Sequence, residues 1–135
     1  MPVDPSLTGR TFPPSAPFEV TEERLAAFAA ATGTPYDEGG PAPATFPIVV
    51  AFTAMRQLME DPEVGIELHH VVHGAQKFTH QRPVRAGDRL SAQLTVTALR
   101  QVAGTDIIST SSAITDAGGS SVCTAEATLV HRAGA

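Results

Sequence analysis

Residues 90–98, LSAQLTVTA, alternate strictly between apolar and polar side chains. Leu90, Leu94 and Val96 fall on one side of this stretch together with two alanines, while serine, glutamine and threonines fall on the other. Successive side chains of a β-strand point to opposite faces, so this period of two predicts a strand with one buried face.

Two further runs of strand-forming residues follow, residues 105–115 (TDIISTSSAIT) and residues 121–132 (SVCTAEATLVHR). Gly104 and the sequence DAGG at 116–119 supply the turns between the three runs. Short turns join antiparallel neighbours, so the three runs predict a meander. All 11 prolines lie at or before Pro83. Because proline cannot donate to a sheet ladder, their absence from the second half favours sheet there.

The period of two also extends upstream, from Leu68 to His80, before a turn at Pro83 and the sequence AGD at 86–88. Read as one continuous extended segment, these residues divide between two faces. One predicted face carries His69, Val71, His73, Ala75, Lys77 and Thr79. On this interpretation the side chain of Gln76 lies on the other face, away from that of His73.

Two helices are predicted in the first half of the chain. Residues 21–32 (TEERLAAFAAAT) begin with Thr21, a favourable N-cap, and are followed by Gly33. A longer helix begins at Thr45, tolerates Pro47 in its first turn and ends at the sequence DP at 61–62. The apolar residues Val49, Phe52, Met55, Leu58 and Met59 recur at steps of three and four, as in a mostly buried helix.

A short extended N-terminal piece, two helices and a meander make an α+β layout. A curved antiparallel sheet wrapped around one long helix is the hotdog architecture. We therefore expect residues 1–135 to form a single hotdog domain. The sheet edge and the helix ends stay exposed in one copy, so a paired form is expected.

Composition excludes several classes of function. The chain has 9 basic and 14 acidic residues, a formal net charge of −5, and its basic residues are scattered. This argues against a nucleic-acid partner. The single cysteine, Cys123, cannot form an internal disulfide, and the sequence has no run of about 18 apolar residues. We also expect no secretory leader, because the first ten residues lack a basic segment followed by an apolar one. We expect a cytoplasmic protein with no membrane span.

The histidines are concentrated before the meander, at His69, His70, His73 and His80. In an extended segment, His69 and His73 lie about 13 Å apart, too far to share one ion. His70 and His73 would point to opposite faces. We therefore expect no metal site, and no cofactor.

Residues 71–96 (VVHGAQKFTHQRPVRAGDRLSAQLTV) contain an H-G-x-Q sequence followed by R-P and G-D. This resembles the pattern of the MaoC-like dehydratases, in particular the FAS1-like (MaoC N-terminal) dehydratase family. Residues 42–50 (APATFPIVV) are similar to the start of that family's central helix, and the resemblance extends over residues 8–132. The matching residues are His73, Gly74, Gln76, Arg82, Pro83, Gly87, Asp88 and Leu90.

The resemblance implies (3R)-specific hydration of 2-enoyl thioesters, or the reverse dehydration of 3-hydroxyacyl thioesters, carried on CoA or acyl carrier protein. Such chemistry needs an acid, a base and backbone donors that hold the thioester oxygen. Catalytic members of the family carry their Asp and His in a D-x-N-P-x-H loop. Aligned on Pro35, this chain has Thr32 in place of the Asp and Asp37 in place of the His. It thus resembles the non-catalytic half of a double hotdog, as in the two-subunit dehydratases of mycolic-acid synthesis, whose partner hotdog supplies the Asp–His pair.

In this half-enzyme hypothesis an acyl tunnel lies beside the central helix. Three of its candidate lining residues, Phe46, Val49 and Phe52, are apolar and lie at helical spacing. The same pattern is typical of residues that pack in the core, so it does not by itself indicate ligand contact. Hydrogen bonds of His73 and Gln76 would either orient the tunnel strand or satisfy neighbouring backbone. The candidate substrate-binding residues are Tyr36, Thr45, Phe46, Val49, Phe52, His73 and Gln76.

Other hypotheses remain open at this stage. A self-sufficient homodimer would use Asp37 with His69, His70 or His73. A binding module would hold an acyl thioester without turnover. A thioesterase is disfavoured, because Glu60 lies at the far end of the central helix. The densest basic stretch, made by Lys77, Arg82, Arg85 and Arg89, would either dock the phosphates of CoA or carrier protein or form a solvated strand end.

Overall fold

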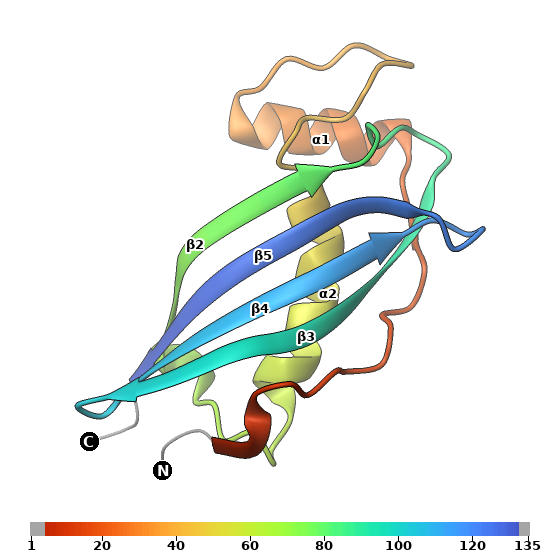
Figure 1. Cartoon of the computed structure of the whole chain (residues 1–135). Coiled ribbons are helices and arrows are strands. Elements are labelled where there is room, and N and C mark those ends of the chain that lie inside the picture. Colours follow the sequence, from red (N-terminus) through yellow and green to blue (C-terminus); the bar gives the residue numbers. More distant parts are fainter. Residues whose placement is uncertain (1–4, 133–135) are drawn as a thin grey trace.

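The computed structural model describes residues 5–132. An antiparallel sheet curves around one helix, α2 (Pro47–Glu60), and a second helix, α1 (Glu22–Thr32), lies across the N-terminal end of α2 (Figure 1). The strands follow the order β1-β3-β4-β5-β2. They are β1 (Phe18–Glu19), β2 (Val71–His80), β3 (Arg89–Val102), β4 (Thr105–Thr115) and β5 (Ser121–Arg132).

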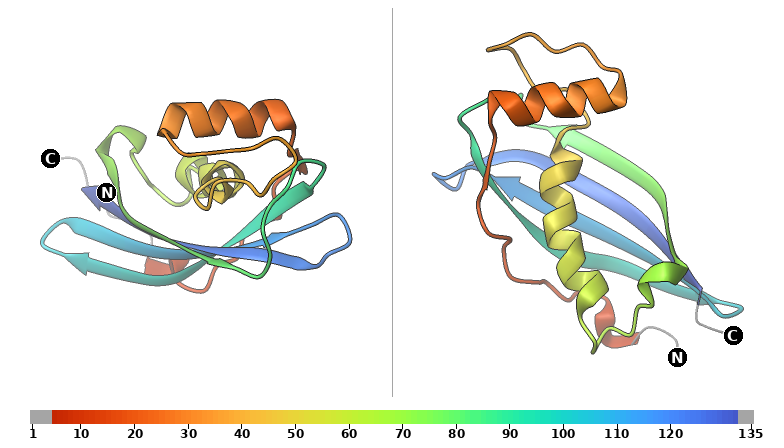
Figure 2. Two further views of the ribbon diagram at one scale, coloured as in Figure 1. Left: turned by 90° about the horizontal axis from the view of Figure 1, so that it is seen from above. Right: turned by 180° about the vertical axis from the view of Figure 1, so that it is seen from behind.

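Helix α2 packs on the concave face of the sheet (Figure 2). Ala51 and Ala54 are at most 2% exposed, and these small side chains allow the helix to lie close to the strands. The apolar face predicted for residues 90–98 meets the helix through Leu94 and its neighbours, which are fully buried. Full burial of a leucine side chain contributes about 1.5–3 kcal/mol, so this contact stabilises the packing of the helix on the sheet. The α+β hotdog prediction is confirmed.

Most of the predicted elements are confirmed at their predicted positions. The side chain of Thr21 caps α1 by accepting the amide of Arg24 at 3.1 Å, and Gly33 ends it in the left-handed region at φ 68°. Pro47 occupies the first turn of α2. The predicted strands at 105–115 and 121–132 coincide with β4 and β5, whereas β3 continues four residues beyond the predicted end at 98, to Val102.

The prediction of one extended segment from Leu68 to His80 is wrong at two places. Leu68–His70 forms a 3-10 turn, because the amide of His70 donates to the carbonyl of Glu67 at 2.8 Å. Within β2, pairing with β5 shifts by one residue between His73 and Ala75, which makes a bulge at Gly74. A bulge reverses the alternation, so residues before and after Gly74 that were assigned to opposite faces come to the same side.

The two edges of the sheet differ. The N-terminal segment runs along the outer edge of β3, where Gly9 donates to the carbonyl of Val96 at 2.7 Å and Phe12 donates to that of Leu94 at 2.9 Å. Strand β2 forms the other edge, and no described segment pairs with its outer side. The sheet is therefore covered at one edge and open at the other.

The predicted domain of residues 1–135 includes 1–4 and 133–135, which lie outside the described residues. Within residues 5–132, no helix is both long enough and apolar enough to cross a membrane.

Candidate functional site

A pocket of about 660 Å³ opens where the C-terminal half of α1, the first turns of α2 and the open edge strand β2 meet. A second pocket, of about 180 Å³, continues along α2 and shares His73 with the first. We call the two together the trough. Phe28, Thr32, Thr45, Ile48, His73, Gly74, Ala75, Gln76 and Phe78 line its wide part, and Phe52, Met55, Met59, Val71, His73 and Leu129 line its narrow part.

The bulge at Gly74 brings two of the predicted site residues together on the trough side of β2. The side chains of His73 and Gln76 are hydrogen-bonded, with Nε2 of His73 2.9 Å from Oε1 of Gln76. Nε2 of Gln76 donates to the carbonyl of Lys77 at 3.4 Å, which leaves Oε1 as the acceptor. His73 therefore donates through Nε2–H. In a regular strand, residues three apart point to opposite faces, so this pair depends on the bulge.

Thr32, the residue at the position of the family's Asp, lies at the C-terminal end of α1 and lines the trough. Its hydroxyl donates to the carbonyl of Phe28 at 2.8 Å and lies 2.8 Å from the hydroxyl of Thr34. Asp37, at the position of the family's His, is exposed on the loop after α1. It is not among the described residues that line the trough.

Tyr36 faces α1 instead of the trough. Its hydroxyl donates to a carboxylate oxygen of Glu22, and the amide of Gly39 donates to the other oxygen at 3.0 Å. The hydrogen bond to Glu22 and then burial raise the pKa of Tyr36 to about 12. Glu22, in the first turn of α1, thus holds the loop of residues 33–43 against the helix.

The predicted tunnel residues between Thr45 and Phe52 separate into three environments. Phe46 is 1% exposed and packs edge-on against Phe28 at a centroid distance of 5.3 Å, so it belongs to the core. Val49 is half-buried and packs against the core. Phe52 is 45% exposed and lines the narrow part of the trough, and Thr45 lines the wide part.

The N-terminus of α2 has few free backbone donors. The amides of Phe46, Ile48 and Val49 donate to the carbonyls of residues 43, 45 and 46, and Pro47 has no N–H. An oxyanion hole needs unpaired donors aimed at the developing charge. This helix end is therefore poorly suited to hold a thioester oxygen.

The wall of the trough is nearly uncharged. Among the described residues that line it, His73 alone has a titratable side chain. Aliphatic and aromatic side chains such as Ile48, Phe52 and Phe78 supply most of the remaining surface. The trough can hold an apolar chain, but it lacks the acid–base pair that proton transfer to and from such a chain requires.

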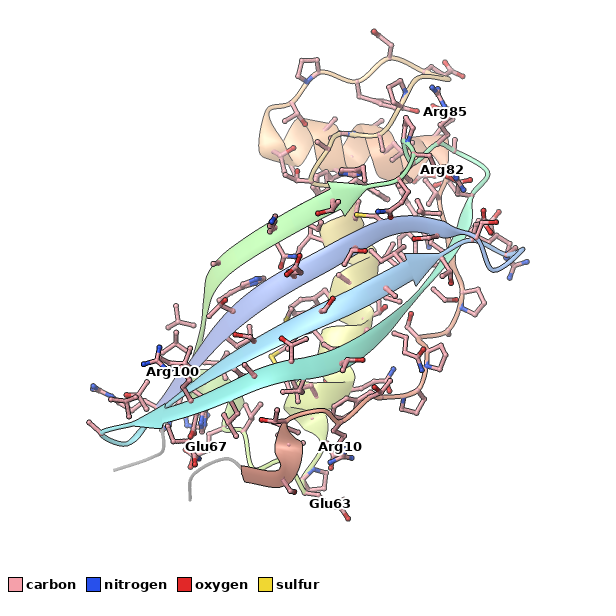
Figure 3. All side chains as sticks on the ribbon, in the orientation of Figure 1. Arg10, Glu63, Glu67, Arg82, Arg85 and Arg100 are labelled. Atoms are coloured by element: carbon pink, nitrogen blue, oxygen red, sulfur yellow. The ribbon has the colours of Figure 1, made fainter. Side chains whose placement is uncertain are left out.

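The R-P-x-x-x-G-D sequence, residues 82–88, has a structural role at the end of the sheet where the chain passes from β2 to β3 (Figure 3). The Arg82 guanidinium donates to both carboxylate oxygens of Asp88, at 2.9 and 3.2 Å, and to Asp116 at 3.3 Å. Asp88 also accepts the amide of Arg85 at 2.9 Å. Gly87, at φ 97°, allows the tight turn between them. Arg82, one of the four predicted phosphate-docking residues, is thus already paired.

A buried polar pair at the opposite end of the sheet, near the end of β5, was not among the predicted site residues. Nδ1 of His131 lies 2.9 Å from Oδ2 of Asp106, and the two side chains are 0% and 2% exposed. Nε2 of His131 accepts the amide of Glu67 at 2.9 Å, so Nδ1 carries the proton and donates to Asp106. The two residues are direct partners in the β4–β5 register. Pairing the two predicted strands across their turn would have revealed this contact.

Comparison with known proteins agrees with the α+β hotdog fold described above. Residues 6–125 match the family described as "FAS1-like, dehydratase domain region". The chain belongs to this family. A UPF0336 protein of Streptomyces coelicolor is 42% identical over 146 residues, covering 98% of this chain and 97% of that one. A UPF0336 protein of Leifsonia xyli subsp. xyli is 42% identical over 145 residues, with the same coverage.

Solved structures of MaoC-like dehydratases have the same fold. The HadBC (3R-hydroxyacyl-ACP dehydratase) complex of Mycobacterium tuberculosis matches at a TM-score of 0.75 and 27% identity, covering 92% of this chain and 96% of that chain. The (R)-hydratase of A. caviae involved in PHA biosynthesis matches at a TM-score of 0.64 and 22% identity, covering 93% of this chain and 96% of that chain. The FAS1-like dehydratase family and the HadBC complex indicate the general reaction class of the hydratases and dehydratases, whereas the A. caviae structure shows the shared fold.

Proposed function

We propose that this chain is the tunnel-forming subunit of a (3R)-specific 3-hydroxyacyl-thioester dehydratase, or 2-enoyl-thioester hydratase, and that a partner hotdog supplies the catalytic Asp–His pair. The observation that carries the proposal is the trough. It has the size and apolar wall of an acyl-binding site, yet the family's Asp position holds Thr32 and His73 is the one titratable side chain among its described lining residues.

In this function, the residues of the chain bind and orient the substrate. Phe28, Ile48 and Phe78 exclude water from the acyl chain, and burial of each methylene contributes about 0.8 kcal/mol. The Nε2–H of His73 is held by Gln76, which keeps a polar pair at a fixed place on an otherwise apolar wall. The Thr32 hydroxyl, already bonded to a helix carbonyl, does not exchange protons with substrate at neutral pH.

The partner is expected to cover the open side of the trough at β2. The similarity to the HadBC complex, at 27% identity, supports a second hotdog as the kind of partner. The substrate is an acyl-CoA or an acyl carrier protein thioester, and no cofactor is required because hydration and dehydration need acid–base chemistry alone.

The test is a crotonyl-CoA hydration assay with three samples: the purified chain, a MaoC-like protein of the same organism that carries the Asp–His loop, and the two co-expressed. We expect activity in the co-purified complex and none in this chain alone. The complex should also exceed the partner alone in kcat/KM, because only the complex has the complete tunnel.

Activity of this chain by itself would overturn the proposal, and loss of that activity in Asp37→Asn would establish the self-sufficient homodimer instead. Failure of this chain to co-purify with the partner or to change its activity would also overturn the proposal. Tight binding of crotonyl-CoA under those conditions would then identify a binding module.

A further inference from the structure

Three potential metal ligands meet at the end of the sheet where β5 ends and β2 begins. They are Glu67, His69 and His70, and one ligand atom from each lies within 4.8 Å of the corresponding atoms of the other two. Figure 3 labels Glu67 at this end, opposite Arg82 and Arg85. The cluster is separate from the trough, whose described lining residues include none of the three.

The local backbone explains the cluster. After α2 the chain turns at Asp61, whose carbonyl accepts the amide of Val64 at 3.1 Å, and Gly65 continues the turn at φ 85°. The 3-10 turn at Leu68–His70 then folds His69 and His70 back toward Glu67. The expectation of no metal site rested on an extended conformation for these residues, and the structure does not have that conformation.

The segment that carries the ligands is anchored to the sheet. The amide of Glu67 donates to Nε2 of the fully buried His131 at 2.9 Å, and His131 is held in turn by Asp106. Asp106 also accepts from the amide of the Gln101 side chain at 2.9 Å. A ligand whose backbone is fixed in this way loses less conformational entropy when it binds an ion.

The arrangement of His70 and Glu67 favours chelation over a simple ion pair. Nδ1 of His70 lies 2.9 Å from Oε2 of Glu67. Nevertheless, this buried ring nitrogen has no partner in hydrogen-bond geometry. Because this nitrogen is not engaged in a hydrogen bond, it is available as a ligand atom beside the carboxylate. The ring of His69 lies beside that of His70, with a centroid distance of 4.2 Å.

We propose that Glu67, His69 and His70 form a binding site for a divalent transition-metal ion, with Zn²⁺ as the representative ligand. Two imidazoles and one carboxylate suit Zn²⁺ and its neighbours better than Mg²⁺ or Ca²⁺, which prefer oxygen ligands. Bond lengths of about 2.0–2.2 Å bring ligand atoms closer to one another than 4.8 Å, so binding requires the side chains to move inward slightly. His69 is exposed, which leaves the remaining coordination positions accessible to water.

The experiment titrates the purified full-length chain with ZnCl₂ by isothermal calorimetry, beside a parallel titration with MgCl₂. We expect one-to-one binding of Zn²⁺ and no binding of Mg²⁺. His69→Ala and Glu67→Gln should each weaken Zn²⁺ binding by about 100-fold, since loss of even an outer partner of a metal ligand commonly costs about 10–100-fold.

Two matched variants serve as controls. Glu63→Gln makes the same charge change as Glu67→Gln on the same loop, and His80→Gln removes a histidine at the other end of β2. Both should retain the wild-type affinity. Absence of Zn²⁺ binding by the wild type would overturn the proposal, and so would unchanged binding in His69→Ala. Because His69 is exposed, its replacement tests the site even if Glu67→Gln disturbs folding.

Discussion

Arg82 and Asp88 hold the end of β2 and two turns together through one guanidinium. The carboxylate of Asp88 accepts from Arg82 and from the amide of Arg85, while Arg82 also reaches Asp116. Burial by itself would raise the pKa of Asp88. The hydrogen bonds from Arg82 and from the Arg85 amide outweigh burial and hold the pKa below its ordinary value.

This shift predicts a pH-dependent effect of Asp88→Asn. A carboxyl whose pKa is lower in the folded state stabilises the protein above its unfolded pKa, near 4, and loses that contribution as the pH falls through the folded value. We expect Asp88→Asn to lower the free energy of unfolding by about 2 kcal/mol at pH 7. At pH 3 the loss should be much smaller. Urea denaturation at the two pH values measures both.

The exposed Asp37 provides the control for Asp88→Asn. Asp37→Asn makes the same chemical change on a loop, and we expect a free energy of unfolding close to that of the wild type at pH 7. An equal loss of stability by Asp88→Asn at pH 7 and pH 3 would show that the Arg82 pair does not act through the charge of the carboxylate.

A second prediction at the residue scale concerns Tyr36, the only tyrosine of the chain. Since its hydrogen bond to Glu22 is the largest cause of a pKa raised to about 12, Glu22→Gln should move the phenol pKa toward its ordinary value of about 10. Ultraviolet absorbance of the phenolate during alkaline titration reports this one side chain.

Glu23→Gln is the matched control, because Glu23 occupies the same first turn of α1 and has the same effect on the helix dipole. It should leave the Tyr36 titration unchanged. A Glu22→Gln curve that coincides with that of the wild type would mean that Glu22 does not hold the loop of residues 33–43.

At the scale of the element, local pattern predicted the regular parts of the chain and failed where long-range contacts decide the backbone. The alternation in β4 and β5 and the capping signals around α1 are properties of adjacent residues, and these elements were confirmed. The 3-10 turn depends on His131, which lies 64 positions from Glu67, and the bulge at Gly74 depends on pairing with β5. Neither dependence is visible in a local period.

The candidate site shows the same division between local pattern and tertiary contact. Thr45, His73 and Gln76 do line one pocket, but Phe46 turns into the core and Tyr36 turns toward Glu22. Phe28 and Ile48 were not proposed as lining residues. Their apolar side chains are equally typical of residues that pack in the core. Only the position of β2 relative to the two helices shows that they line the trough.

The wall of the trough on α2 gives a prediction for the complex with the partner. Ile48→Trp should fill the wide part of the trough. We expect KM for long-chain enoyl thioesters to rise by about tenfold, on the scale of a change of about 1.4 kcal/mol in binding, with a much smaller effect on crotonyl-CoA. Hydration kinetics over a series of chain lengths would measure this selectivity.

Val102→Trp introduces the same side chain at a position that is 51% exposed at the end of β3. Its kinetics should match those of the wild-type complex at every chain length. If Ile48→Trp and Val102→Trp behaved alike, the acyl chain would not lie in the trough.

At the scale of the whole molecule, composition predicted the architecture well. The confinement of proline to the first half favoured an uninterrupted meander, and that half of the chain is the sheet of β3, β4 and β5. The sheet requires a helix on one face only, and α2 provides it. Composition did not indicate which edge of the sheet is covered, because that depends on the path of a short N-terminal segment with little pattern of its own.

That difference between the edges limits how such sheets can assemble. The segment of residues 9–15 occupies hydrogen-bonding groups on the outer side of β3, and its Pro13 and Pro14 cannot donate to a further strand, so strand addition is favoured beside β2. Once the β2 strands of two chains lie together, the joined sheet ends in a covered edge on each side. Further growth by strand addition is then disfavoured at both ends, which protects a protein rich in β-structure from extending into a fibre.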